Sequence, residues 1–190
     1  MIKRAADIVF SLLGLIVFSP ILLIAIILVW LQDFKSPFYI APRVGINRKI
    51  FKMIKIRTMV INADKSGVDT TSANDMRITP IGRMVRKIKL DELIQLWNVL
   101  KGDMSLVGPR PQVERDVDIY TQEEYRLLNI KPGITDFSSI IFSDEGEIVS
   151  GSDNPDLCYN QLIRPWKSRL GLFYIQKKSS LIDLTIILLK

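Results

Sequence analysis

Between Ile8 and Leu31 the chain has 24 consecutive residues without a charged side chain. A helix of that length reaches about 36 Å, enough to cross the hydrocarbon core of a bilayer with some tilt. A simple transmembrane anchor would account for this segment. A cleaved signal peptide fits less well, because no small-x-small cleavage site follows Trp30 and the apolar region is too long.

Pro20 lies at the centre of this segment, directly after Ser19. Proline removes a backbone donor and clashes with the carbonyl four residues earlier, so it kinks or breaks a helix; the Ser19 hydroxyl can satisfy a freed backbone group. Basic residues flank the segment on both sides, and such residues favour the cytoplasmic face. We therefore favour a re-entrant helix–break–helix that enters and leaves by one face. A spanning helix remains the alternative.

The basic residues are concentrated beside the apolar segment. Residues 34–57 carry seven Lys and Arg and no acid, whereas residues 58–190 carry 17 basic and 18 acidic residues. A basic stretch next to an apolar helix suits anionic lipid head groups and phosphate. We therefore expect membrane lipids as partners, and no nucleic acid.

The 190 residues allow one compact domain beside the apolar segment. We predict an α+β fold with a membrane hairpin helix at residues 1–33 and a cytoplasmic domain at the membrane interface at residues 34–190. Strands at Ser36–Gly45 and Ile50–Arg57 would form a short β-hairpin. The remaining pattern predicts a loop at residues 62–75, helices at 83–90, 91–100 and 113–129, an acidic loop at 143–155 and a helix at 161–178.

Two of these helices, at residues 83–90 and 161–178, are amphipathic and rich in basic residues. Such helices suit a membrane interface, but a solvated face or packing on the core explains them equally well.

Composition limits the chemistry. The chain has no histidine, which excludes His-based triads, His proton shuttles and His-ligated metals. Cys158 is the single cysteine, so no intramolecular disulfide forms. Carboxylates, hydroxyls, Lys and Arg remain, together with a hard cation bound through oxygen.

Asp91 and Glu92 are adjacent acids at the start of a predicted helix. Acids in a first turn commonly act as caps, because the helix dipole and free amides stabilise them. The same field keeps a carboxylate ionised and available as a nucleophile or a cation ligand.

A second group of residues suits phosphate. Arg110 lies between Pro109 and Pro111, which restrict the backbone and can aim the guanidinium; a rigid surface turn is the alternative. Lys55 and Arg57 are two residues apart on a predicted strand and would share a face.

Several stretches also carry a resemblance. They are KRAAD at 3–7, Ser19-Pro20, RVG at 43–45, FKMIKIRTM at 51–59, DMRITPIGRMVRKIKLDELIQLWNVLKGDMSLVGPRP at 75–111 and KPGIT at 131–135. With these, nearly the whole chain resembles the bacterial sugar transferase family, the small monotopic phosphoglycosyl transferases.

The resemblance implies transfer of sugar-1-phosphate from a UDP-sugar to a polyprenyl phosphate such as undecaprenyl phosphate, with Mg²⁺ and release of UMP. Asp91 would be the nucleophile that carries the phosphosugar, and Glu92 would help to place the metal or the incoming phosphate. Lys55, Arg57, Arg77 and Arg110 would bind phosphate. The enzyme would act at the cytoplasmic face of the bacterial inner membrane, in the first membrane step of glycoconjugate synthesis, and a homodimer is a further candidate assembly.

The chain departs from the family pattern after KPGIT. Asp136-Phe137-Ser138-Ser139 stands where many members have a Gly-Leu-Ala-Gln type segment, and the acids Asp144, Glu145 and Glu147 follow. The identity of the sugar therefore does not follow from the resemblance. An inactive lipid-binding protein and a metal-dependent phosphohydrolase are the competing functions.

Overall fold

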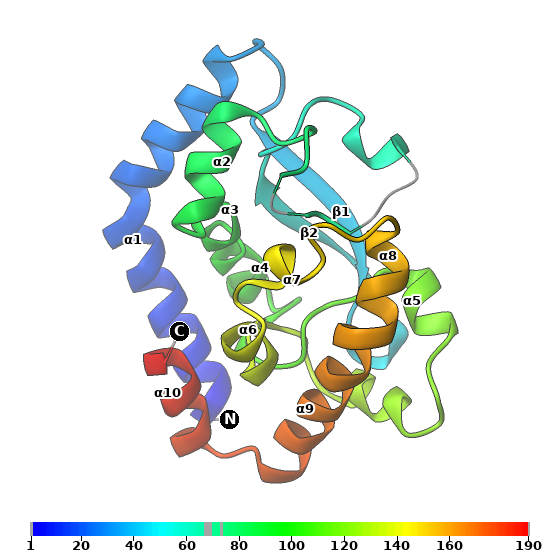
Figure 1. Cartoon of the computed structure of the whole chain (residues 1–190). Helices are drawn as coiled ribbons and strands as arrows, with labels where there is room; N and C mark the ends of the chain where they lie inside the picture. The colour runs from blue at the N-terminus through cyan, green and yellow to red at the C-terminus, as the bar shows by residue number, and fades with distance from the viewer. Residues whose placement is uncertain (1, 67–69, 73, 190) are drawn as a thin grey trace.

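The computed structural model describes residues 2–66, 70–72 and 74–189, and its helices and two small sheets agree with the predicted α+β class (Figure 1). In chain order the elements are α1 (Ile2–Leu31), β1 (Phe38–Val44), β2 (Ile50–Ile56), α2 (Pro80–Lys87), α3 (Leu90–Leu93), α4 (Leu96–Lys101), β3 (Ser105–Val107), α5 (Glu114–Asp118), β4 (Gly133–Thr135), α6 (Phe137–Ile141), α7 (Glu145–Ile148), α8 (Pro155–Cys158), α9 (Arg164–Lys177) and α10 (Ser180–Leu189).

The apolar segment forms α1, a single helix that continues through Pro20, where the sequence analysis expects two helices. Pro20 cannot donate to the Ile16 carbonyl four residues earlier, and the Ser19 hydroxyl donates to that carbonyl instead, at 2.8 Å. The expected role of Ser19 is thereby confirmed, and it explains how the helix stays continuous. Figure 1 shows α1 bowed along one side of the molecule.

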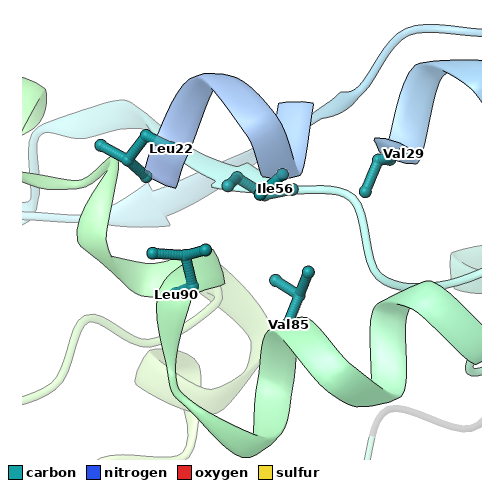
Figure 2. Close-up of a cluster of buried hydrophobic side chains, with 6 residues drawn as sticks. Leu22, Val29, Ile56, Val85 and Leu90 are labelled. Atoms are coloured by element: carbon teal, nitrogen blue, oxygen red, sulfur yellow. The ribbon is translucent and has the colours of Figure 1, made fainter. Parts of the chain in front are cut away.

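The second half of α1 packs on the domain through one face. Figure 2 shows Leu22 and Val29 of α1 in a cluster with Ile56 of β2, Val85 of α2 and Leu90 of α3. Burying an aliphatic side chain of this size contributes about 1.5–3 kcal/mol, so this cluster fixes α1 against the elements that lead to the acid pair.

Between Ile8 and Leu31, much of the remaining α1 surface is apolar and exposed. Phe10, Ile16, Val17 and Leu23 are each about half exposed or more. Within the described residues α1 is the one helix long and apolar enough to cross a membrane by length and composition.

Both ends of α1 are tied to the same domain. Near the N-terminal end, Arg4 donates to the carbonyls of Val99 and Leu100 at 2.5 and 2.8 Å. Just beyond the C-terminal end, the Asp33 carboxylate accepts two bonds from Arg57, at 2.5 and 2.6 Å. The two ends of the helix therefore lie against one body.

The N-terminal attachment continues through Asp7 and Lys3. Buried Asp7 accepts from the Ser105 hydroxyl at 2.9 Å and from the Leu106 amide at 3.1 Å. Lys3 Nζ lies 2.6 Å from Asp183 of α10, which also accepts from Tyr174. These contacts hold β3 and α10 against the start of α1.

Strands β1 and β2 form the predicted hairpin, with Phe38 opposite Ile56 and Val44 opposite Ile50. The fully buried Asn98 of α4 joins this hairpin to the helices: it accepts from the Ile54 amide at 3.1 Å and donates to the Lys52 carbonyl at 2.8 Å. Asn98 therefore fixes β2 relative to the segment that carries the acid pair.

The C-terminal half differs from the sequence expectations in three places. The predicted helix at 113–129 is α5 followed by a separate 3-10 turn at Glu124–Asn129. The predicted acidic loop contains α7, a single helical turn. The helix predicted at 161–178 starts earlier, at Pro155, and passes through a π turn at Tyr159–Ile163, which accommodates the missing amide hydrogen of Pro165.

Candidate active site

Asp91 and Glu92 occupy the first turn of α3, as predicted. Lys89, directly before α3, has φ 53° and ψ 26°, a left-handed conformation that costs energy for a residue other than glycine. This turn separates α2 from α3. Because α3 has only four residues, the helix dipole contributes little to the ionisation of the acids.

Glu92 joins three separate segments. Its Oε1 accepts from Lys55 Nζ of β2 at 3.0 Å and from Arg110 of the loop after β3 at 2.8 Å. All three side chains are largely buried, with exposed fractions between 15% and 34%. Their mutual attraction is therefore stronger than that of a surface pair. Two predicted phosphate-binding cations thus meet at one acid of the predicted pair.

Asp91 is more deeply buried than Glu92, with 7% of its surface exposed. Burial raises the pKa of Asp91, whereas the positive charges of Lys55 and Arg86 act in the opposite direction. Its carboxylate makes no ion pair in the described part of the chain. The nearby cations bind other residues, Lys55 to Glu92 and Arg86 to Thr58. Asp91 therefore lies close to positive charge without a direct ion pair among the described residues.

The loop that carries Arg110 is fixed by a close backbone contact. A Cβ on Gly133 would lie 2.1 Å from the Gly108 nitrogen, so no side chain fits there. The Gly133 amide donates to the Pro109 carbonyl at 3.0 Å, and the Gly108 amide donates to the Thr135 carbonyl at 3.0 Å. GPRP and KPGIT thus act as one unit, and the nearby Glu92 raises the pKa of Arg110.

Arg57 does not join Lys55 at the acid pair. Its guanidinium binds Asp33, and its Nε donates to the Ser36 carbonyl at 2.7 Å. Arg57 lines the same cleft as Lys55, and phosphate binding by Arg57 remains a prediction.

Arg77 is likewise engaged within its own segment. It pairs with Asp75 at 2.6 Å and donates to the carbonyls of Ala63 and Thr70. These bonds connect described parts of the segment between β2 and α2, which border the same cleft as the acids. Phosphate binding by Arg77 remains a prediction.

Arg86 of α2 is a site residue that the sequence reasoning missed. Its Nε donates to the Thr58 hydroxyl at 2.7 Å, and Asp91 is the acid that acts most strongly on its charge. The sequence placed Arg86 on a basic helix face and favoured neither solvent nor membrane. Its approach to Asp91 depends on the left-handed turn at Lys89, which the sequence does not signal.

These residues line a cleft of about 1070 Å³, which is at the upper limit for small-molecule sites. Within the described residues no three acids, cysteines or histidines form a metal cluster. Mg²⁺ is commonly held by one or two carboxylates together with substrate phosphates, so the adjacent Asp91 and Glu92 fit this ion when a diphosphate is present.

Three relatives are similar to this chain. UDP-N-acetylgalactosamine-undecaprenyl-phosphate N-acetylgalactosaminephosphotransferase of Aeromonas hydrophila is 36% identical over 144 residues, covering 74% of this chain and 34% of that protein. A putative undecaprenyl-phosphate N-acetylgalactosaminyl 1-phosphate transferase of Bacillus subtilis is 46% identical over 134 residues, covering 70% and 71%. Undecaprenyl-phosphate glucose phosphotransferase of Komagataeibacter xylinus is 36% identical over 194 residues, covering 98% and 34%.

This chain therefore spans about a third of the length of the Aeromonas and Komagataeibacter relatives and about 71% of the Bacillus relative. The profile of the family described as bacterial sugar transferase matches residues 1–190. Together with the acid pair and its cations, this match over the whole chain establishes that the protein belongs to the bacterial sugar transferase family.

Proposed function

We propose that this protein transfers sugar-1-phosphate from a UDP-sugar to undecaprenyl phosphate, giving undecaprenyl diphosphosugar and UMP. The observation that carries the proposal is the position of Asp91, a buried carboxylate in a cation-lined cleft on a domain that is packed against an apolar helix. The relatives are named for undecaprenyl-phosphate sugar phosphotransferase activity, which is consistent with both substrates.

The first step is attack by an Asp91 carboxylate oxygen on the β-phosphorus of the donor. A phosphorus–oxygen bond forms to Asp91, the bond from the β-phosphorus to the bridging oxygen breaks, and UMP leaves with the bonding electron pair. Lys55 and Arg86 favour the ionised form of Asp91 against the effect of burial. An ionised carboxylate needs no histidine base, and the chain has none.

The second step regenerates Asp91. A phosphate oxygen of undecaprenyl phosphate attacks the same phosphorus, and the bond to Asp91 breaks. Arg110 and Lys55 stabilise the negative charge of the transferring group in both steps. To do so, they donate to phosphate oxygens in place of the Glu92 carboxylate. Mg²⁺ held by Asp91 and Glu92 would supply further charge neutralisation for the diphosphate.

The lipid substrate requires a site at the membrane, and α1 meets that requirement. Its exposed apolar face suits a bilayer, and both its ends are bonded to the one domain, Arg4 to α4 and Asp33 to Arg57. A helix that crossed the bilayer would have its ends on opposite sides. We therefore favour a re-entrant α1 at the cytoplasmic face of the bacterial inner membrane.

The test is replacement of the nucleophile. Wild-type protein mixed with UDP-N-acetylgalactosamine, UDP-galactose or UDP-glucose should gain the mass of one phosphosugar and, with undecaprenyl phosphate, should release UMP. Asp91→Asn should show neither, whereas Asp118→Asn, which removes an exposed carboxylate, should show both. An adduct that survives in Asp91→Asn would refute the assignment.

The products separate this proposal from a metal-dependent phosphohydrolase. Transfer yields a lipid diphosphosugar and UMP, whereas hydrolysis yields free sugar phosphate and needs no lipid. Sugar phosphate formed without lipid, at the same rate as in its presence, would favour the hydrolase.

A further inference from the structure

Residues 136–151, which depart from the family pattern, form one wall of the cleft that contains Asp91. Ser139, Phe142, Glu145 and Glu147 from α6, α7 and the link between them line this cleft. In Figure 1 these two short helices are the yellow elements in the middle of the molecule. The proposed chemistry uses none of them.

Glu145 is held in position by Lys167 of α9, which lines the same cleft. The Lys167 ammonium donates to the Glu145 carboxylate; the Lys167 side chain is 9% exposed and that of Glu145 is 39% exposed. The same ammonium lies 5.1 Å from the ring centre of Tyr159, on the π turn. The buried ammonium thus positions a carboxylate that remains accessible at the cleft wall.

Glu145 is also close to the proposed phosphate site. After Glu92, it is the acid that contributes most to raising the pKa of Arg110. Ion pairs join Lys55 and Arg110 to Glu92, and Lys167 to Glu145, and the charge of Glu145 acts on Arg110 within the same cleft. The group next to Arg110 on the α7 side therefore meets a carboxylate.

Strand β1 brings a further cation to the cleft. Arg43 lines it together with Arg110 and Arg115, and the charges of Arg110, Asp116 and Arg115 act on it. These arginines suit the phosphates of a nucleoside diphosphate. A carboxylate repels phosphate but accepts strong hydrogen bonds from hydroxyl groups, so the α7 side suits the sugar.

We propose that Glu145, positioned by Lys167, binds hydroxyl groups of the donor sugar and restricts the donor to uncharged sugars. This inference rests on the proposed function, because it takes the donor to be a UDP-sugar. It assigns the α7 wall to sugar recognition and makes Glu145 a specificity-determining residue. A uronic acid, which carries its own carboxylate, would be repelled at this wall.

The test compares donors that differ only in the sugar, by calorimetric titration of the detergent-solubilised full chain with Asp91→Asn, in which no adduct forms and each donor binds without reacting. UDP-galactose should bind this parent variant more tightly than UDP, and UDP-glucuronic acid should bind it more weakly than UDP-galactose. All further substitutions are made in this variant. Glu145→Gln should weaken the binding of UDP-galactose about 10-fold and should change the affinity for UDP less than twofold. It should also reduce the difference in affinity between UDP-galactose and UDP-glucuronic acid.

Asp144→Asn is the matched control, because it removes the neighbouring exposed charge, which does not line the cleft. It should leave all three affinities unchanged. Lys167→Met removes the ammonium that positions Glu145. It should also weaken the binding of UDP-galactose more than the binding of UDP. Unchanged UDP affinity in each variant reports that the site is folded.

Equal losses of affinity for UDP and UDP-galactose in Glu145→Gln would overturn the inference, and so would equal affinities of the parent variant for UDP and UDP-galactose. Because this binding is measured without turnover, the two proposals fail separately. Sugar-dependent binding by the parent variant, with no UMP release by wild type, would refute the proposed function and leave the sugar site in place.

Discussion

Glu92 binds the two cations of the proposed phosphate site, Lys55 and Arg110. Leaving these cations unpaired in a largely buried site would be costly, so this acid stabilises the site. Under the proposed function, phosphate oxygens of the substrate replace Glu92 as the acceptors of these bonds.

Arg110 should therefore be essential for the rate. Arg110→Ala should lower kcat/KM for UMP release about 10²–10³-fold, on the scale of lost oxyanion donors. Arg110→Lys should restore little, because an ammonium lacks the planar fork that binds two oxygens. Arg126→Ala, at an exposed arginine, serves as the control. Near-normal kcat/KM in both Arg110 variants would show that this arginine is structural.

At the residue scale, the sequence identified the centre of the candidate site and missed its periphery. Asp91, Glu92, Lys55 and Arg110 come together as expected, because each lies in a stretch with a local reason for its position. Arg86 could not be recognised, since its approach to Asp91 depends on the left-handed turn at Lys89, and lysine is not a residue that predicts such a turn.

Among the elements, the hairpin agrees with its predicted bounds to within two residues, because alternation and a turn fix it locally. The helix predicted at 113–129 does not form as one element. Thr121 and Glu124 cap each other's amides, at 3.3 and 2.8 Å, which starts a new turn there. This Thr-x-x-Glu capping box is visible in the sequence and was the overlooked signal.

The bond between Asp33 and Arg57 ties the end of α1 to the end of β2, and it should make stability depend on pH. Arg57 lowers the pKa of Asp33 from its usual value near 3.8 to about 2. Because the pKa is lower in the folded protein, the stabilisation is complete above about pH 4 and is lost as the pH falls towards 2.

Thermal unfolding in detergent can measure this effect. The Tm of wild type should exceed that of Asp33→Asn at pH 6, and the difference should shrink between pH 4 and pH 2. Asp118→Asn, which breaks a more exposed pair with Arg48, should change Tm little at any of these pH values. A difference for Asp33→Asn that stays constant down to pH 2 would contradict the role of this ion pair.

For the whole molecule, the attachment of both ends of α1 to one domain makes a topological prediction. Ile2 and Lys35 are both exposed and flank the helix, so single cysteines there in a Cys158→Ser background should be tolerated. Both cysteines should resist a membrane-impermeant maleimide in intact cells and react once the inner membrane is opened. A third cysteine at the exposed Asp118 marks the side of the domain.

Labelling of position 2 from outside intact cells, with positions 35 and 118 protected, would establish a spanning helix. The sequence could favour the re-entrant arrangement only through Pro20 and the basic flanks. It gave no indication that Lys3 and Arg4 bond to β3, α4 and α10, because those partners lie about a hundred residues or more further along the chain.

The partners of α1 are also separated in time during synthesis. The helix leaves the ribosome first, and Arg57 follows soon after to hold its C-terminal end at Asp33. Arg4 must wait for Val99 and Leu100, and Lys3 for Asp183, near the end of the chain. At about 5–20 residues per second, Leu100 follows Arg57 by about 2–9 seconds. For that interval the bonds from α4, β3 and α10 to the N-terminal half of α1 are not yet formed.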